Sequence, residues 1–352
     1  MISLRAKKPM IISGPCSAET PEQLMTTCSA LAKTGVVDVL RAGIWKPRTR
    51  PGTFEGNGEE GLKWYADVKR EVNLPIATEV ATGKHVELAL KYGVDILWIG
   101  ARSTVNPFSV QDIADALRGV DVPVLIKNPM HPDVDLWQGA VQRIEAVGVK
   151  DIGLIHRGFS VYGSSQYRNN PQWHIAIEMR RRMGDMPMLC DPSHICGNRE
   201  FLREISQKSA DMNFDGLIIE SHICPSEAWS DAAQQLTPDN LALLVKSIIW
   251  RKQNDNSPEY LQALEILRGE IDGLDSELLE VISKRMSVAS KIGEIKKENN
   301  VAILQTGRWS EIIDKMSNQA VKHNLSTELV TKVLDAIHVE SINIQNSVMN
   351  KQ

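Results

Sequence analysis

The chain has 352 residues, 42% of them hydrophobic, and a formal net charge of −4 at pH 7. This length accommodates one large domain and one small one. The slight excess of acid argues against nucleic acid or an anionic membrane as the main partner, although local basic clusters can still bind small anions. We find no signal segment, no apolar run approaching the ~18 residues of a membrane span, and no paired spacing among the five cysteines. We therefore expect a cytoplasmic protein with reduced thiols.

Short apolar runs alternate with helical periods from residue 9 to residue 250. Strands are predicted at Met10–Ser13, Val37–Ala42, Ile76–Glu79, Ile96–Ile99, Val124–Lys127, Ile152–His156, Met188–Cys190 and Leu217–Glu220. Helices are predicted at Glu22–Lys33, Glu59–Glu71, Lys84–Tyr92, Gln111–Arg118, Asp135–Val147, Gln172–Arg182, Asn198–Ser209 and Asp239–Arg251. Eight strand–helix pairs in about 250 residues favour a (β/α)8 barrel. A doubly wound open sheet is the alternative, but near-equal units without a Gly-x-Gly-x-x-Gly turn disfavour it.

Three of the predicted strands lead into residues that bind metal ions. The last strand ends in Glu220, and Asp231 follows after a short loop. The strand before it leads to His194, and the first strand leads to Cys16. In a barrel the carboxyl ends of the strands share one face, so these side chains should converge. A thiolate, an imidazole and two carboxylates form a mixed site for a borderline divalent ion, which leaves Mn, Fe, Co and Zn open.

Basic residues collect at the same strand ends. They are Arg41 and Lys46 after the second strand, Arg102 after the fourth, Lys127 at the fifth and Arg157 after the sixth. Cations that face one mouth repel one another unless anions lie between them, and guanidinium forks match phosphate and carboxylate geometry. We therefore favour a pocket for an anionic substrate over a merely basic rim.

A polar segment after the last barrel helix, residues 254–257, predicts a linker between a domain of residues 1–253 and one of residues 258–352. Ser257 and Pro258 suit the N-cap and first position of a helix. Beyond them, apolar residues follow alternating steps of three and four, which is typical of a coiled-coil seam. A helix of ~40 residues is ~60 Å long, more than so small a domain can cover. We therefore expect it to pack against a partner chain.

One seam position of this helix holds Arg285. An unpaired charge there costs several kcal/mol, so either a buried acid or a ligand anion should meet it. Lys296 lies about three turns further on nearly the same face, whereas Arg268 lies on a different face. Two more helices are predicted at Thr306–His323 and Thr327–Met349.

The motifs of residues 5–253 closely resemble the 3-deoxy-D-arabino-heptulosonate 7-phosphate (DAHP) synthase family, most of all its type I beta branch. The motifs are Gly14-Pro-Cys-Ser17, Lys46-Pro-Arg-Thr49, Asp191-Pro-Ser-His194, Glu220-Ser-His222 and Ser230-Asp231. The resemblance implies condensation of phosphoenolpyruvate with erythrose 4-phosphate. Related octulosonate 8-phosphate synthases lack Lys-Pro-Arg-Thr, so this stretch favours erythrose 4-phosphate; another phosphoenolpyruvate–sugar phosphate aldolase remains the rival.

The same resemblance implies a role for each residue of the mouth. The metal ligands would be Cys16, His194, Glu220 and Asp231. Arg102, Lys127 and Arg157 would hold the phosphate of phosphoenolpyruvate, Arg41 and Lys46 its carboxylate, and Arg48 and Thr49 the erythrose 4-phosphate. Because clustered cations lower the pKa of a lysine, Lys46 and Lys127 are both candidates for general acid–base catalysis.

The carboxyl-terminal part resembles the all-helical chorismate mutase, an intertwined dimer that converts chorismate to prephenate. The resemblance places around chorismate Arg285, Lys296, Arg308, Ser341, Gln345 and, from the other chain, Arg268. Gln305 and Trp309 depart from the family, which has acidic residues there. Two alternatives stay open: a mere dimerisation module, and a ligand-binding regulatory domain with weak mutase activity that senses chorismate or prephenate.

Overall fold

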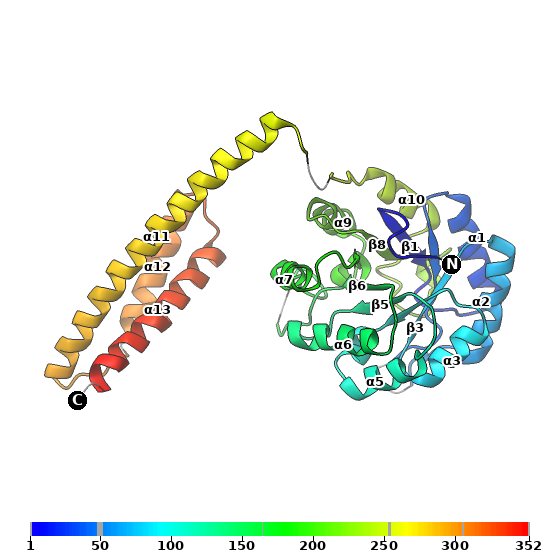
Figure 1. Cartoon of the computed structure of the whole chain (residues 1–352), viewed down its shortest axis with the longest axis horizontal. Coiled ribbons are helices and arrows are strands. Elements are labelled where there is room, and N and C mark those ends of the chain that lie inside the picture. Colours follow the sequence, from blue (N-terminus) through cyan, green and yellow to red (C-terminus); the bar gives the residue numbers. More distant parts are fainter. Residues whose placement is uncertain (1, 48–51, 164, 253–254, 305, 351–352) are drawn as a thin grey trace. The chain divides into compact units, whose positions relative to one another are not determined.

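The computed structural model describes residues 2–47, 52–163, 165–252, 255–304 and 306–350, without the side chains of residues 306–310 and 317. The chain divides into two compact units, Met1–Gln253 and Asn254–Gln352 (Figure 1). In the described part of the chain, no helix combines the length and the apolar character that a bilayer span requires.

Eight parallel strands form a closed barrel in the first unit (Figure 1). The strands are β1 (Met10–Gly14), β2 (Val39–Arg41), β3 (Ile76–Val80), β4 (Ile96–Ile99), β5 (Val124–Lys127), β6 (Ile152–His156), β7 (Met188–Cys190) and β8 (Gly216–Glu220). Each strand pairs with the next, and β1 pairs with β8 to close the barrel. The predicted (β/α)8 architecture is confirmed, and β2 is shorter than predicted.

Helices surround the barrel. They are α1 (Pro21–Lys33), α2 (Gly58–Val72), α3 (Gly83–Lys91), α4 (Ala101–Thr104), α5 (Pro107–Ala116), α6 (Val134–Ala146), α7 (Trp173–Met183), α8 (Pro192–Cys196), α9 (Leu202–Asp211) and α10 (Pro238–Ser247), with a short 3-10 turn η1 (Pro225–Glu227). α5 begins four residues before its predicted start, because Asn106 accepts from the backbone N–H groups of Phe108 and Ser109 as an N-cap.

Two other helix predictions are wrong, each for a local reason. The short helix α8 was not predicted; Asp191 caps it, and Gly197 ends it in a left-handed conformation. The following helix therefore begins at Leu202 instead of Asn198. α10 stops at Ser247 instead of Arg251, because Ile248 is extended. The backbone of Ile249 then bonds the side chain of Gln207 on α9.

Alternate strand residues fill the inside of the barrel. Met10 and Ile12 of β1 belong to this inner layer, whereas Ile11 between them packs outward against the helices. The inner layer also contains Trp98, and Leu4 from the amino-terminal segment packs against it. Because side chains fill the barrel, ligands can bind only at its ends, and in this fold the carboxyl ends of the strands carry the chemistry.

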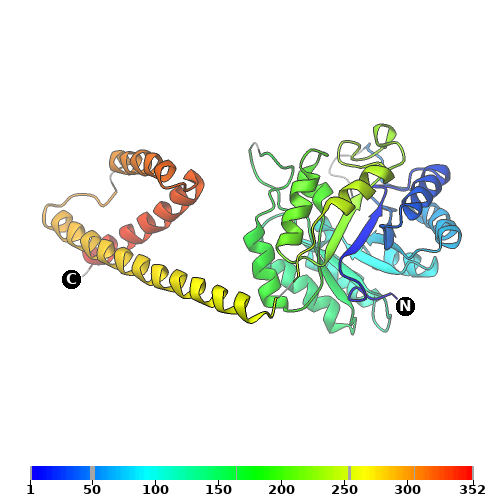
Figure 2. The same ribbon diagram turned by 90° about the horizontal axis from the view of Figure 1, so that it is seen from above.

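The second unit consists of α11 (Pro258–Glu298), α12 (Thr306–Lys322) and α13 (Thr327–Asn350). α11 and α13 approach closely at Gly293, where an added Cβ would lie 3.2 Å from the Cα of Gln345. The amino-terminal half of α11 extends beyond α12 and α13 in both views (Figures 1 and 2). Its apolar seam is exposed: Ile271 is 56% and Leu278 is 53% accessible.

Candidate functional site

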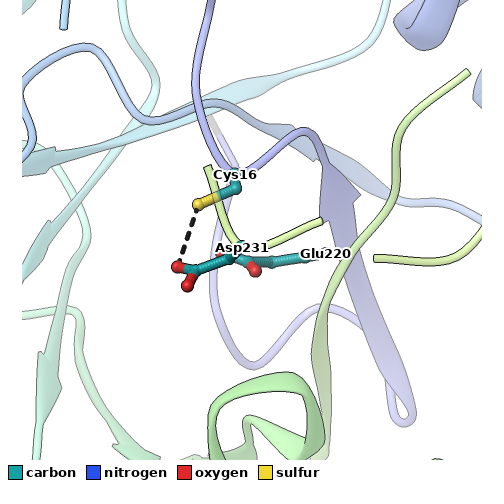
Figure 3. Close-up of side chains that lie close together, drawn as sticks. All are labelled: Cys16, Glu220 and Asp231. Carbon is teal, nitrogen blue, oxygen red and sulfur yellow. Dashed lines mark hydrogen bonds between the residues drawn. The ribbon is translucent and has the colours of Figure 1, made fainter. Parts of the chain in front are cut away.

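The carboxyl ends of β1 and β8 bring three acidic side chains together. Register pairs Gly14 with Glu220, and Cys16 follows two residues later. A Cβ on Gly14 would lie 1.9 Å from the carbonyl oxygen of Arg41, so only glycine lets β1 approach β2 this closely. One ligand atom each of Cys16, Glu220 and Asp231 lies within 4.8 Å of the others (Figure 3).

His194 lies beside these three groups. Its Nδ1 is 2.8 Å from Oδ2 of Asp191, and its Nε2 is 3.8 Å from Oε1 of Glu220. Asp191 also accepts from the His194 backbone N–H as the cap of α8. This arrangement orients the ring, because Nδ1 bonds a carboxylate and Nε2 thereby faces the site. One sulfur, one nitrogen and two carboxylate groups fit a borderline divalent ion.

The thiol of Cys16 is protonated in the absence of an ion. Burial, reinforced by the negative charge of Glu220, raises its pKa to about 12, although Lys46 acts in the opposite direction. The thiol donates to Oδ2 of Asp231 at 3.4 Å (Figure 3). An incoming cation must therefore displace a proton from this sulfur.

The two carboxylates are ionised. Burial alone would raise the pKa of Glu220, but His194 and Arg41 lower it below its usual value. Burial also opposes ionisation of Asp231, yet His194 and Arg168 lower the pKa of that group strongly. The site therefore presents two negative oxygen groups to a cation.

Two of the predicted substrate-binding cations are bonded to acids of the site. Arg41 is buried, and its Nη1 lies 3.1 Å from Oε1 of Glu220 while Nη2 donates to the Cys16 carbonyl at 3.2 Å. Lys127 Nζ lies 2.8 Å from Oδ2 of Asp191. Arg41 therefore also supports Glu220 of the candidate ligand group, and Lys127 supports Asp191, which orients His194.

The other two predicted phosphate ligands lie further along the mouth. Burial lowers the pKa of Arg157 to about 10, with Arg168 and Arg102 adding repulsion that Asp191 partly offsets. Its guanidinium donates to the Gly158 carbonyl at 3.4 Å. Arg102 is exposed on α4. A nearly buried guanidinium beside two other cations is a favourable place for an anion.

One prediction about Lys46 is wrong. Its Nζ lies 3.0 Å from Sγ of Cys16 and 3.0 Å from the Cys16 carbonyl oxygen. Burial would lower the pKa of Lys46, but Cys16 and Glu220 outweigh it and raise the pKa. The shift is therefore opposite to the one we predicted from clustered cations, although Arg41 acts in the predicted direction, and Lys46 stays protonated. Arg48 and Thr49 lie outside the described residues.

Sequence reasoning missed Arg168 and the two glutamines that follow Asp231. Arg168 Nη1 lies 2.9 Å from Oδ1 of Asp231 and donates to Oε1 of Gln234 at 3.0 Å. The Gln234 amide donates to Oε2 of Glu220 at 2.6 Å. The signal in the sequence was an adjacent amide pair, Gln234 and Gln235, just before the apolar Leu236.

A second candidate site lies among the helices of the second unit. Its cavity of about 290 Å³ is lined by Arg285, Lys296, Ile303, His338, Ser341 and Gln345, together with apolar residues. Arg285 donates to the Ser341 hydroxyl at 2.6 Å, and Lys296 donates to the Ile303 carbonyl at 2.5 Å. Gln345 is 8% exposed, and its Oε1 has no partner in the described part of the chain. These groups offer two cations and an unused amide oxygen to a ligand.

The remaining predicted residues of this unit are placed less completely. Arg268 is exposed on α11 and does not line this cavity in its own chain. The side chains of Arg308 and Trp309, and the whole of Gln305, lie outside the described residues. A buried acid or a ligand anion was expected beside Arg285; in the described part of the chain the Ser341 hydroxyl bonds it, which leaves the charge of Arg285 available to a ligand anion.

Comparison with known proteins gives two family matches. Residues 4–256 match the DAHP synthetase I family, and residues 267–346 match chorismate mutase type II. A phospho-2-dehydro-3-deoxyheptonate aldolase of Thermotoga maritima is 32% identical over 226 residues, which are 64% of this chain and 64% of that protein. A 2-dehydro-3-deoxyphosphooctonate aldolase of Dechloromonas aromatica is 26% identical over 261 residues, covering 68% of this chain and 89% of that one.

Solved structures agree with the fold. The crystal structure of the Thermotoga maritima DAHP synthase superposes with a TM-score of 0.61 at 31% identity, over 67% of each chain. A truncated form of the DAHP synthase from the same organism gives a TM-score of 0.58 at 28% identity, over 67% of this chain and 84% of that one.

Proposed function

Because the chain belongs to the DAHP synthetase I family, we propose that residues 1–253 condense phosphoenolpyruvate with erythrose 4-phosphate, giving DAHP and phosphate. Residues 258–352 rearrange chorismate to prephenate, which makes the protein a bifunctional enzyme of the shikimate pathway. The observation that carries the first activity is the cluster of Cys16, Glu220 and Asp231, with His194 beside it, at a mouth lined by cations.

The four residues of that cluster would hold a divalent Mn, Fe, Co or Zn ion. When bound, the ion supplies Lewis-acid polarisation of the aldehyde. Arg157, Arg102 and Lys127 would hold the phosphate of phosphoenolpyruvate, and Arg41 and Lys46 would contact its carboxylate. Arg48 and Thr49 would hold the phosphate end of the aldose.

Lys46 is suited to supply a proton. Carbon–carbon bond formation converts the aldehyde oxygen to a hydroxyl, and a water must add to the former C2 of phosphoenolpyruvate before phosphate leaves. The raised pKa of Lys46 keeps its ammonium charged at neutral pH, so Lys46 would act as the general acid for one of these oxygens, although the same shift makes it a weaker acid than an ordinary lysine. Lys127, which is bonded to Asp191, would instead bind the substrate phosphate as a cation.

The rival sugar is arabinose 5-phosphate. The likeness to the octonate aldolase of Dechloromonas aromatica supports this rival substrate, because that protein is 26% identical and shares the barrel region. Lys46 and the following Pro-Arg-Thr favour erythrose 4-phosphate, as does the heptonate aldolase at 32% identity. Assays of the purified chain with each sugar, with and without chelator, separate the two functions.

In the helical unit, Arg285 and Lys296 would bind the carboxylate groups and ether oxygen of chorismate, with Gln345 facing the ether oxygen and Ser341 completing the pocket. The exposed seam of α11, with Leu278 at 53% and Ile271 at 56% accessibility, supports a homodimer in which Arg268 reaches the partner's pocket. Arg308 is the remaining proposed ligand. Small molecules would be the only other partners, in the cytoplasm, without nucleic acid or membrane.

The helical unit would also regulate the barrel. Chorismate and prephenate derive from the product of the barrel, so a ligand in the Arg285 pocket reports on pathway output. A mutase assay of the purified chain tests the catalytic role of this unit. If chorismate binds but no prephenate forms, the unit would be a sensor or a dimerisation module instead of an enzyme.

A further inference from the structure

Two consecutive glutamines contact the proposed metal site of Cys16, Glu220, Asp231 and His194. Gln234 is 1% and Gln235 is 0% exposed. Buried amides need partners for both the carbonyl oxygen and the NH2 group. In both residues each end of the amide is hydrogen-bonded. The partners are Glu220 and Cys16 themselves, Ser230, which precedes Asp231 in the chain, and Arg168, which is bonded to Asp231.

Gln234 connects the two carboxylates of the cluster. Its Nε2 donates to Oε2 of Glu220 at 2.6 Å, and its Oε1 accepts from Arg168 at 3.0 Å. The same Arg168 nitrogen is bonded to Asp231 at 2.9 Å. A carboxylate can only accept and a guanidinium can only donate, so these partners allow one orientation of the amide. Oε2 of Glu220 is thereby engaged, while Oε1 accepts from Arg41 at 3.1 Å and lies 3.8 Å from Nε2 of His194.

Gln235 connects Cys16 to the loop that carries Asp231. Its Oε1 accepts from the Cys16 backbone N–H at 2.9 Å, and its Nε2 donates to the Ser230 carbonyl at 2.8 Å. A second link runs in parallel, because the hydroxyls of Ser17 and Ser230 bond each other. Asp231 itself has a φ of +49°, which is costly for a residue with a Cβ. Bonds on its flanking residues hold that conformation in place.

We propose that Gln234 and Gln235 are positioning residues of the metal centre. Gln234 holds Oε2 of Glu220 and, together with Arg41 on Oε1, fixes the orientation of this carboxylate towards the ion, and Gln235 ties the Cys16 backbone to the loop that carries Asp231. This inference rests on the metal dependence proposed above. Neutral amides suit the task, because they orient a carboxylate without adding a positive charge beside the cation.

The test compares near-isosteric variants by binding of cobalt(II) alone. Gln234→Met and Gln235→Met keep the length of the side chain and remove its hydrogen bonds. The matched control is Gln111→Met: Gln111 also joins a guanidinium to a carboxylate, Arg143 at 2.7 Å and Asp115 at 3.1 Å, but on the exposed surface. Dissociation constants come from competition with a chelator, and the thiolate-to-cobalt charge-transfer band reports the geometry at the sulfur.

Both buried variants should bind cobalt about 10- to 100-fold more weakly. Gln235→Met should also shift or weaken the charge-transfer band, whereas Gln111→Met should leave affinity and spectrum unchanged. A purely structural role would lower the urea midpoint without moving the band. Should a methionine variant fail to fold by circular dichroism, Gln234→Asn and Gln235→Asn carry the same test, since they keep a polar group and shorten its reach.

Wild-type affinity and an unaltered band in the folded variants would overturn the proposal. Failure of the unmodified protein to bind cobalt at all would be a different result, because it would remove the proposed metal dependence itself. The two failures are therefore distinguishable in one titration series.

Discussion

The ammonium of Lys46 lies 3.0 Å from the sulfur of Cys16. This contact joins a residue of the Lys-Pro-Arg-Thr stretch to a proposed metal ligand. Burial and Glu220 hold the thiol protonated, and the lysine beside it is protonated as well. A cation that takes the sulfur must therefore displace a proton and face an adjacent ammonium. Metal binding and the charge state of the mouth are linked through this pair.

Metal binding should release a proton, and its affinity should rise with pH. Burial raises the pKa of Cys16 to about 12, so the metal-free thiol is protonated at neutral pH, whereas the ligand is the thiolate. One released proton corresponds to about a tenfold gain in apparent affinity per pH unit on the alkaline side of neutrality. Calorimetry in buffers of different ionisation enthalpy measures the proton directly. An affinity independent of pH would mean that the thiol is not a ligand.

Chelation should separate the two activities. A chelator should abolish condensation, a divalent transition metal should restore it, and His194→Ala should prevent that rescue because Nε2 faces Glu220 at 3.8 Å. Mutase activity should survive both treatments, since the Arg285 pocket uses only charge and hydrogen bonds. Activity assays on the same preparation make the comparison. Full condensation by His194→Ala in metal-free buffer would contradict the ligand assignment.

The sequence predicted the barrel because its signal repeats: eight apolar runs alternate with helical periods, and each confirms the others. The same strand-end argument grouped Cys16, Glu220 and Asp231, which the structure brings together; their binding of an ion stays a prediction. Arg168 could not be found this way. It lies 63 residues from Asp231 in the chain, on a loop whose path depends on tertiary packing.

The predicted direction of the Lys46 pKa shift was wrong for a related reason. Residue types told us that cations are numerous at the mouth, but the sign of a shift depends on the nearest neighbours. Cys16 and Glu220 raise the pKa of Lys46 most strongly, and no spacing in the sequence encodes their approach to this lysine. The predicted end of a helix was wrong where a side chain accepts the backbone N–H that a helical hydrogen bond would use, as Gln207 does for Ile249.

Stability of the barrel should depend on pH through Asp215, at the start of β8. Its carboxylate accepts from the Met188 backbone and bonds Arg180 and Lys8 at 2.8 and 2.9 Å. Burial opposes ionisation, but these donors lower the pKa of Asp215 below its ordinary value of 3.8. The folded value is lower than the unfolded one, so the contribution is complete above pH 3.8 and is lost as the pH falls further.

Asp215→Asn should therefore cost about 1.5–3 kcal/mol of unfolding free energy at pH 7, and less at acid pH. Urea unfolding at both pH values measures the difference. Asp67→Asn is the control, because Asp67 bonds Arg70 on the exposed surface, where such pairs contribute about 0–1 kcal/mol. An equal loss at neutral and acid pH would show that the charge of Asp215 does not contribute.

Arg285→Ala should lower mutase activity by about two orders of magnitude or more, because it removes a charge that we propose faces the substrate. The helix should remain folded, since the partner of Arg285 is the neutral Ser341 hydroxyl at 2.6 Å. Circular dichroism and a prephenate assay on the same sample give both results. Loss of helical signal would reveal an internal acid paired with Arg285, and the ligand role would then fail.

Prephenate should inhibit DAHP synthesis in the intact chain, and Arg285→Ala should relieve that inhibition. The ligand's carboxylates would neutralise Arg285 and Lys296 and would thereby order the helical unit. Both cations line one cavity with Gln345, whose Oε1 has no partner among the described residues. A coupling of about 1–3 kcal/mol between the two sites corresponds to a 5- to 150-fold change in affinity. Initial rates of condensation at increasing prephenate, in both proteins, measure this coupling.

The control is Lys284→Ala, one residue away on the exposed surface of α11, which should leave the inhibition intact. Equal inhibition of the unmodified chain and Arg285→Ala would place the effector site on the barrel, and the regulatory role of the helical unit would be excluded.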